Sequence, residues 1–406
     1  MSEPIVSLMN PEFADDPVGA YARLREKSPL VRIGHPGGPP VWLITRCEDV
    51  KAALSDPRLV VDYSSVPGHQ GRSLVDEMVE AANLPDDFRD YAGNMMYQDG
   101  KEHARLRRLV TPALTVRRIK ALRPRMEKTS ARLIDALAQK GSGDLIEEYS
   151  SPLTGTVICE LIGIDEADQP QMREWMHDYA NGDQAASAQG MVEYTKKLIE
   201  RRRAAPTDDM ISTLVQTSDE DGDRLSEAEI IGLVLLLVIA GHHSTAHFIP
   251  NAVVALFDHP DQLALLRAKP EALPHAIDEL LRIANPLPIA APRYATEDLE
   301  FAGVSICKGE ALTGSFQSAN YDPRVFPEPE RFNVERVMKR GEGHLSFGAG
   351  PHYCIGAALA RLEGEIALDH LLLKRDSLEI TVSRDDLSYT DISLGLRMLA
   401  ELPVRL

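Results

Sequence analysis

Residues 347–356 read Phe-Gly-Ala-Gly-Pro-His-Tyr-Cys-Ile-Gly, and this stretch decides how the rest of the chain is interpreted. Three glycines surround one cysteine, Cys354, and glycine lets a backbone adopt positive φ angles and come close to a flat ligand. The next residues, 357–361, read Ala-Ala-Leu-Ala-Arg and favour a helix. Cys354 is therefore predicted at or just before a helix N-terminus, where the helix dipole and free N–H groups stabilise a thiolate. The alternative is a glycine-rich loop with a buried structural cysteine.

The composition excludes several classes of protein. The chain has 406 residues, 44% of them apolar, and a net charge of −18, which argues against nucleic acid or an anionic membrane as the main partner. Its start shows no basic region followed by an apolar stretch, and the longest apolar stretch, 230–240, is shorter than the roughly 20 residues of a membrane span. We expect a cytoplasmic protein without a membrane anchor. No two of the four cysteines lie within four residues of each other, so no zinc or redox pair is indicated.

The periodicity of apolar residues predicts one mainly α-helical domain over residues 1–406, with small β-sheets. The longest helix is expected at 227–257, where Ser226 and Glu229 form a capping box and Pro250 should kink the helix or weaken one turn. Such a long apolar helix must cross the centre of the molecule. Further helices are predicted at 118–139, 169–179, 190–203, 261–268, 273–282 and 354–373. Strands are predicted at 30–33, 41–45, 299–307, 310–317, 378–382 and 402–406.

At every fixed position, residues 347–356 resemble the haem-binding loop of cytochromes P-450, and the resemblance extends over almost the whole chain. It implies the cytochrome P-450 fold, with haem b buried between the long central helix and the cysteine loop, and Cys354 as axial thiolate. Glu279-Leu-Leu-Arg282 resembles the Glu-x-x-Arg pair of the family, and its third partner is assigned to Arg331 in the aperiodic segment 323–336. Taken alone, this pair would be read as a surface salt bridge.

The resemblance also implies the residues around the haem. In the loop they are Phe347, Gly348 and Gly356. Candidate propionate partners are His103, Arg107, Arg293 and His344, and a solvated basic face is the alternative for the first two. In the long helix Ala240 and Gly241 leave space for dioxygen, while His243 replaces the usual acid and Ser244 the usual threonine, with Thr245 one position later. His243 either relays protons, contacts a polar group of the substrate, or points away. Candidate substrate contacts are Leu287, Ile289, Ala290 and Leu394, and ordinary loop packing is the alternative.

The expected reaction is insertion of one oxygen atom from dioxygen into a small apolar molecule, by hydroxylation or epoxidation, in bacterial natural-product biosynthesis. Electrons are expected from a ferredoxin and its reductase, which would dock on a basic patch. The patch is assigned to Arg105, Arg108, Arg117, Arg118 and Arg361. Two alternatives remain: a haem-thiolate isomerase, dehydratase or peroxygenase that needs no redox partner, and a non-enzymatic helper subunit of similar fold, which the presence of Cys354 disfavours.

Overall fold

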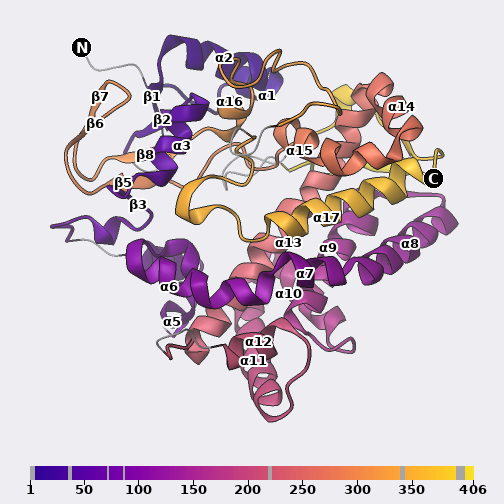
Figure 1. The fold of residues 1–406 in the computed structure, drawn as a ribbon, viewed down its shortest axis with the longest axis horizontal. Helices are drawn as coiled ribbons and strands as arrows, with labels where there is room; N and C mark the ends of the chain where they lie inside the picture. The colour runs from indigo at the N-terminus through magenta and orange to yellow at the C-terminus, as the bar shows by residue number, and fades with distance from the viewer. Residues whose placement is uncertain are drawn as a thin grey trace. The chain divides into compact units, whose positions relative to one another are not determined.

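The computed structural model describes residues 5–34, 39–70, 73–85, 87–217, 222–338, 343–389 and 398–406, which are mostly helical (Figure 1). Two compact units can be distinguished, and each is described by itself. The first contains Met1–Gly71, Asn251–Cys354 and Ser388–Ala400, and the second contains Arg72–Pro250, Ile355–Leu387 and Glu401–Leu406. The single domain expected over residues 1–406 stays a prediction.

The first unit is built on a five-stranded sheet with the order β1-β2-β8-β5-β3. Its strands are β1 (Leu30–Ile33), β2 (Val41–Ile44), β8 (Ala311–Gly314), β5 (Arg293–Ala295) and β3 (Leu59–Val60). All pairs are antiparallel except β2 with β8, which is parallel. The predicted strands at 30–33 and 41–45 are confirmed. The segment 310–317 was predicted as one strand, but after Gly314 it turns into the short helix α16 (Phe316–Asn320), where the side chain of Ser315 accepts a hydrogen bond from the N–H of Ser318.

Helices and a hairpin complete the first unit. The segment predicted as a strand at 299–307 forms two strands, β6 (Leu299–Phe301) and β7 (Val304–Ile306), joined at Ala302 and Gly303, which both have positive φ. Proline occupies the first turn of the helices around this unit, where the missing N–H costs nothing. These helices are α1 (Pro11–Asp15), α2 (Pro17–Lys27), α14 (Pro260–Ala268) and α15 (Leu273–Ile283). Helix α3 (Cys47–Ser55) has no such proline and packs on β8.

The second unit is mainly helical. Its helices are α4 (Leu74–Ala81), α5 (Phe88–Ala92), α6 (Gly100–Val110), α7 (Val116–Ala121), α8 (Arg123–Lys140), α9 (Ser151–Ile162), α10 (Gln169–Asn181), α11 (Gln184–Ala204), α12 (Met210–Gln216) and α17 (Ala357–Leu368). The single helix predicted at 118–139 is instead broken between α7 and α8, because Pro124 stands in the first turn of α8 and cannot continue a preceding helix. A small sheet joins β4 (Ser142–Asp144), β10 (Pro403–Arg405) and β9 (Glu379–Ile380) in that order.

The long helix α13 (Glu227–Asp258) has 32 residues and begins at the predicted capping box, where Ser226 and Glu229 exchange hydrogen bonds. It continues through Pro250 without a break. Within the described residues it is the helix long and apolar enough to cross a membrane, but 67% of its apolar window is buried inside the protein, as expected of a core helix. Its packing is tight at Gly232, where a Cβ atom would lie 2.3 Å from the carbonyl oxygen of Tyr91.

Candidate active site

The cysteine loop is held in one conformation by its own backbone. The N–H of Cys354 donates to the carbonyl oxygen of Phe347 at 2.9 Å. Gly348 and Gly350 have φ angles of +70° and +69°, which side chains rarely adopt. A Cβ atom at Gly350 would also lie 2.5 Å from the carbonyl oxygen of Leu54, so the loop packs directly on the C-terminal end of α3. The glycine pattern thus has two steric causes, a left-handed backbone and a close backbone approach.

The four cysteines differ in what they can bind. Cys47 and Cys159 are buried, and burial raises the pKa of each thiol to about 12, so they are inert core residues. Cys307 is exposed at the end of the β6–β7 hairpin. Cys354 is exposed as well, and α17 begins at Ala357, shortly after it, which confirms the predicted position before a helix N-terminus. An exposed thiol in a rigid glycine loop is suited to bind a metal ion.

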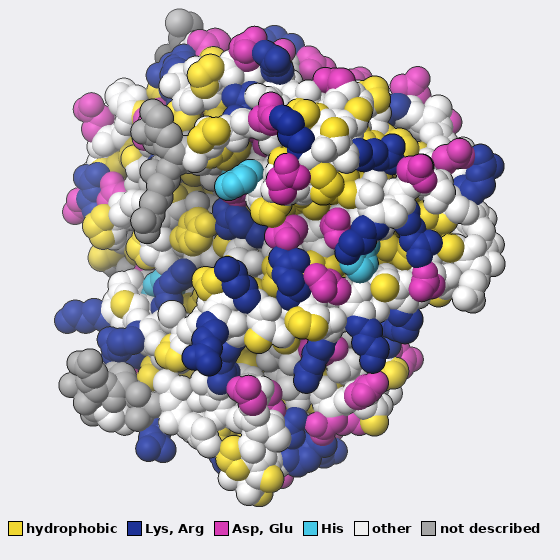
Figure 2. Space-filling model, turned by 45° about the vertical axis from the view of Figure 1, so that its right-hand side comes forward, with side chains coloured by type: hydrophobic (Ala, Val, Ile, Leu, Met, Phe, Trp, Pro, Cys, Tyr) yellow, Lys and Arg dark blue, Asp and Glu magenta, His cyan; other side chains and the backbone are white. Residues whose placement is uncertain are grey.

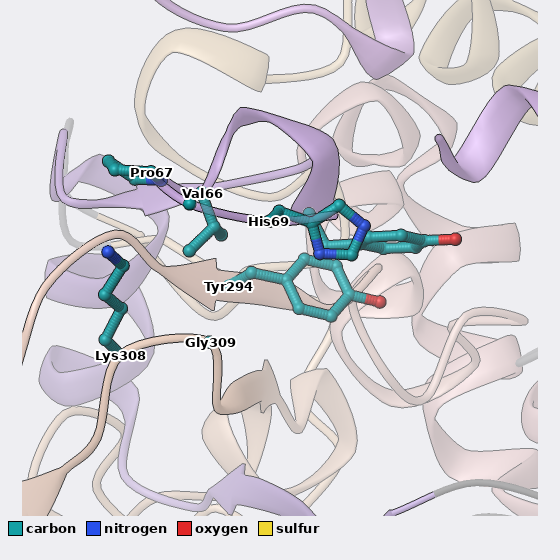
Figure 3. A pocket seen from close by; sticks show the side chains of 8 residues that line it. Val66, Pro67, His69, Tyr294, Lys308 and Gly309 are labelled. Carbon is teal, nitrogen blue, oxygen red and sulfur yellow. The ribbon is translucent and has the colours of Figure 1, made fainter. Parts of the chain in front are cut away.

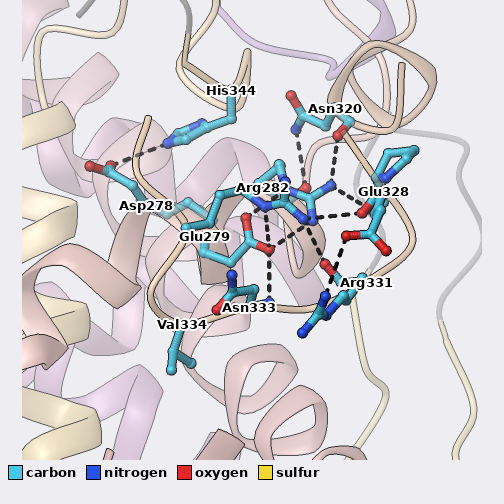
Figure 4. A network of polar contacts seen from close by, with 12 residues as sticks. Asp278, Glu279, Arg282, Asn320, Glu328, Arg331, Asn333, Val334 and His344 are labelled. Carbon is cyan, nitrogen blue, oxygen red and sulfur yellow. Dashed lines mark hydrogen bonds and ion pairs between the residues drawn. The ribbon is translucent and has the colours of Figure 1, made fainter. Parts of the chain in front are cut away.

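Glu279 and Arg282 form a buried ion pair in the first unit (Figure 4). The guanidinium Nε and Nη2 atoms of Arg282 donate to the two carboxylate oxygens of Glu279 at 2.7 and 2.8 Å, and both side chains are 0% exposed. The remaining nitrogen, Nη1, donates to the carbonyl oxygens of Asn320 and Pro329, each at 2.8 Å. The pair therefore connects α15 to α16 and to the segment that follows it. Because both side chains are buried, the alternative of a surface salt bridge is excluded.

The third partner of this pair was assigned wrongly to Arg331. The side chain of Arg331 is mostly exposed and faces Glu328 at 3.3 Å. It is Arg336 whose Nε donates to Glu279 Oε1 at 3.0 Å, while its other nitrogens donate to carbonyl oxygens of the same segment, including that of Arg331. The segment has no helix or strand period, so the sequence does not indicate which of its arginines turns inward.

Three of the four candidate anion partners are buried: His103, Arg293 and His344. His103 and Arg107 lie one turn apart on α6 of the second unit, whereas the other two belong to the first unit. His344 is already hydrogen-bonded, since its Nδ1 accepts the N–H of Ser346 at 3.2 Å and its Nε2 faces Asp278 Oδ1 at 3.3 Å. Its imidazole is therefore oriented by α15.

The middle of α13 has one open position. Ala240 is exposed, although most of the helix around it is buried, and Gly241 packs against the side chain of Ile158 so closely that a Cβ atom would lie 2.6 Å from Ile158 Cδ1. The hydroxyl of Ser244 donates back to the carbonyl oxygen of Ala240 at 2.9 Å. Thr245 points to a buried side. Ala240 is thus an exposed position in the middle of this helix, and the hydroxyl of Ser244 is hydrogen-bonded to its carbonyl oxygen.

The two adjacent histidines have different environments. His242 is a core residue: its Nδ1 lies 2.8 Å from Thr154 Oγ1 and its Nε2 lies 3.3 Å from Ser151 Oγ, and burial lowers its pKa to about 3. His243 is only partly buried, and burial together with nearby His177 lowers its pKa. Both imidazoles are therefore neutral at neutral pH. The three roles considered for His243 remain predictions.

The candidate substrate contacts lie on the segment that follows α15. Leu287, Ile289 and Ala290 are partly exposed, while the residues between and before them are buried. The segment is held at the sheet, because the N–H of Ala290 donates to the carbonyl oxygen of Gly314 at 2.8 Å. Leu394 lies outside the described residues. These positions remain predictions.

A cavity of about 460 Å³ in the first unit contains none of the predicted site residues. Figure 3 shows His69 and Tyr294 on one side of it and Lys308 on the other. Its remaining lining includes Tyr63, Val66 and Gly309. One buried group in the second unit escaped the sequence analysis: Glu363 of α17, whose carboxyl group contacts the Thr245 hydroxyl.

Comparisons with known proteins agree on one family. A model of the family described as Cytochrome P450 matches residues 168–379. The chain is 41% identical to Cytochrome P450 107B1 of Saccharopolyspora erythraea, over 97% of this chain and 96% of that one. It is 38% identical to 6-deoxyerythronolide B hydroxylase of the same organism, over 99% of each chain. The solved structure of the polyketide synthase cytochrome P450 PksS of Bacillus subtilis is similar with a TM-score of 0.84 and 34% identity, covering 97% of this chain and 98% of that one.

Proposed function

The chain belongs to the cytochrome P450 family, and on that basis we propose that Cys354 is the axial ligand through which it works as a haem-thiolate monooxygenase. The observation that carries this assignment is the exposed thiol of Cys354 inside a glycine loop whose conformation other residues rarely adopt. When bound, the haem supplies the reductive activation of dioxygen, from which one oxygen atom enters the substrate and the other leaves as water.

The residues present fit a haem. A flat macrocycle needs small residues where it meets backbone, and the glycines of the cysteine loop and the exposed Ala240 provide them. Its propionates are anions and need cations or donors, which we assign to Arg293 in the first unit and to His103 in the second, with Arg107 beside His103. His344 stays a candidate that must give up its contact with Asp278 before it can donate, because its other ring nitrogen accepts from Ser346. Phe347 and Gly356 frame the cysteine, the first by accepting its N–H and the second as the residue before α17.

Proton transfer is assigned to the α13 segment. Because burial keeps His243 neutral, it can accept or pass a proton but does not store one at neutral pH. Ser244 retains an alcohol, although its hydrogen is directed to the carbonyl oxygen of Ala240, so it must rotate to take part. Thr245 is the second alcohol of the segment. Gly241 keeps the helix close to α9 and fixes the orientation of these groups.

We assign an apolar small molecule as substrate, in contact with Leu287, Ile289 and Ala290. Relatives named as a hydroxylase of 6-deoxyerythronolide B and as a polyketide biosynthesis cytochrome P450 support a bacterial natural-product intermediate, oxidised by hydroxylation or epoxidation. The proposed compartment is the cytoplasm.

We propose that a separate ferredoxin, with its reductase, supplies the electrons, because bacterial members of the family generally use redox partners. The basic patch expected for docking is only partly available. Arg105 forms ion pairs with Glu102, Asp223 and Glu229, so its charge is already neutralised and does not contribute to the patch. Acidic and basic side chains are interspersed on the face drawn in Figure 2, so docking must depend on a few local charges. Arg118 faces Asp208 at 3.4 Å, and Arg361 donates to the carbonyl oxygen of Ala357 at 3.3 Å. Arg108, Arg117, Arg118 and Arg361 stay predictions for this patch.

The test is the carbon monoxide difference spectrum of the reduced protein. Cys354→Ala should lose the thiolate band, and Cys307→Ala is the matched control because it removes the other exposed cysteine. If Cys354→Ala keeps the parent band, another residue binds the iron and the assignment is wrong.

A second function is favoured by one observation, the replacement of the usual acid by a neutral His243. An enzyme with this segment could use peroxide in place of dioxygen and a redox partner. Product formed at the full rate with peroxide alone, and none with ferredoxin, would select this alternative.

A further inference from the structure

The first unit contains a cavity that the proposed monooxygenase function does not use (Figure 3). It lies between residues 63–69, which follow β3, and the turn at 307–310, which joins β7 to β8. Its volume of about 460 Å³ is within the range of sites that bind small molecules. None of the residues that line it is assigned to haem, dioxygen or substrate, so a ligand bound here would have a separate role.

One wall of the cavity is aromatic, and its rings fix one another. The ring of Tyr63 lies 5.0 Å from that of His69 and 5.3 Å from that of Tyr294, measured between centroids, and both contacts are edge-to-face. Val66 and Pro67 extend this wall with apolar side chains. The N–H of Val66 donates to the carbonyl oxygen of Tyr63, and that of His69 to the carbonyl oxygen of Val66, each at 3.0 Å. The wall therefore offers a flat apolar surface on a backbone held by its own turns.

The opposite wall supplies the positive charge of Lys308. The turn that carries this lysine is fixed, because the N–H of Lys308 donates to Asp298 Oδ1 and the N–H of Gly309 to the carbonyl oxygen of Ala295, both at 2.8 Å. The ammonium group reaches the first wall, since a Cβ atom added at Gly68 would lie 3.8 Å from Lys308 Nζ. A ligand in the cavity can thus contact the rings and the ammonium group together.

Lys308 differs from other lysines of the first unit in having no ion-pair partner. Lys51 pairs with Glu48 at 2.8 Å, and Lys269 pairs with Glu335 at 2.9 Å. Across the part of the chain that the structure describes, no carboxylate forms such a pair with the ammonium group of Lys308. A positive charge beside apolar rings attracts an anionic group and repels a cationic one, so the cavity suits an acid better than an amine.

We propose that this cavity binds a small aromatic acid. Its ring would pack on Tyr63, His69 and Tyr294, and its carboxylate would meet the ammonium group of Lys308. The rings supply the apolar surface that an aromatic ring needs, and the lysine supplies the charge that selects an acid over a neutral molecule of the same shape. The site goes beyond the proposed monooxygenase function, since it requires neither reduction of the haem nor turnover.

The first experiment is a calorimetric titration of the holoenzyme with naphthalene-1-carboxylate, with the haem absorption band recorded alongside. The probe should bind at one site with a dissociation constant of about 1 mM or lower and without a shift of the haem band. Naphthalene-1-carboxamide keeps the rings but has no charge, so it should bind about tenfold or more weakly. Equal affinities for the two probes, or no saturable heat from the carboxylate, would overturn the proposal.

The second experiment repeats the titration with substitutions in the two walls. Lys308→Gln should weaken the binding of naphthalene-1-carboxylate about tenfold or more and leave that of the carboxamide unchanged. His69→Ala removes one ring and should weaken both probes about fivefold. Lys269→Gln is the matched control and should bind like the parent. Both wall positions are exposed, so the variants should keep the parent stability. Parent affinity in Lys308→Gln, or binding that shifts the haem band, would place the probe elsewhere and contradict the assignment.

Discussion

Two glutamates, Glu279 and Glu363, are equally withdrawn from solvent, but their surroundings are opposite. The carboxylate of Glu279 accepts hydrogen bonds from Arg282, Arg336 and the N–H of Asn333. Glu363 has apolar neighbours and one hydroxyl. The first arrangement fixes a charge and with it the path of the chain, whereas the second favours the neutral acid because burial raises its pKa. Burial by itself therefore does not decide whether a carboxyl group is charged, and the charge of its neighbours does.

The largest effect is expected when Glu279 loses its main ion-pair partner, Arg282. Arg282→Met leaves a buried carboxylate without its main counter-charge and should lower the free energy of unfolding by about 3–5 kcal/mol. Denaturant unfolding monitored by circular dichroism measures the change. A loss below about 1 kcal/mol would mean that Glu279 accepts a proton as readily as Glu363.

A smaller effect separates the two arginines of the same segment. Arg336→Ala removes a charged hydrogen bond to Glu279 and should lower the free energy of unfolding by about 1.5–3 kcal/mol. Arg331→Ala, at an exposed position, should change it by no more than about 0.5 kcal/mol. Equal losses in the two variants would contradict the assignment of Arg336 as the third partner.

The dependence of the free energy of unfolding on pH tests whether Glu363 is neutral in the folded protein. Its pKa is raised on folding, so the folded protein binds a proton that the unfolded chain releases above a pKa of about 4.3. The stabilisation is complete below that pH and is lost as the pH rises toward the folded pKa, at up to about 1.4 kcal/mol per pH unit. Glu363→Gln should remove this slope, and Glu365→Gln should keep it. Parallel pH profiles for parent and Glu363→Gln would show that Glu363 ionises normally.

The smallest expected effect concerns the hydroxyl next to the acid. Thr245→Val removes the polar contact that the described residues give Glu363, and it should change the free energy of unfolding at acidic pH by about 1 kcal/mol or less, since Glu363 is then neutral in both folded and unfolded chains. Thermal unfolding of the holoenzyme measures it. A loss of several kcal/mol would indicate that Thr245 is needed for packing rather than for proton transfer.

The sequence predicted the elements that have a period or a clear signal. The long helix was expected at 227–257 and is found at Glu227–Asp258, because a capping box marks its start and apolar residues fill it. The Glu279–Arg282 pair was also found, since two residues of one helix face keep a fixed spacing. Its third partner was missed because the segment around Arg331 and Arg336 has no period, and only the fold brings one of them inward.

The functional role of single polar residues in helices was less predictable. His242 and His243 are adjacent in the sequence, but α9 provides hydroxyl partners for His242, which the sequence does not reveal. A signal for Glu363 does exist, because an acid on the apolar face formed by Leu359, Leu362 and Ile366 contradicts the pattern of a core helix. Its contact with Thr245 joins positions far apart in the sequence and needs the structure.

The contact between Gly350 and the Leu54 carbonyl has a consequence for protein engineering. The end of α3 and the loop that carries Cys354 are separated by most of the chain, but they share a surface with no space for one extra methyl group. Chimeras made by exchanging N-terminal segments with relatives will therefore inherit or lose the shape of the cysteine loop according to the few residues near position 54. Crossover points chosen on either side of α3 should give very different yields of pigmented protein from otherwise identical parents.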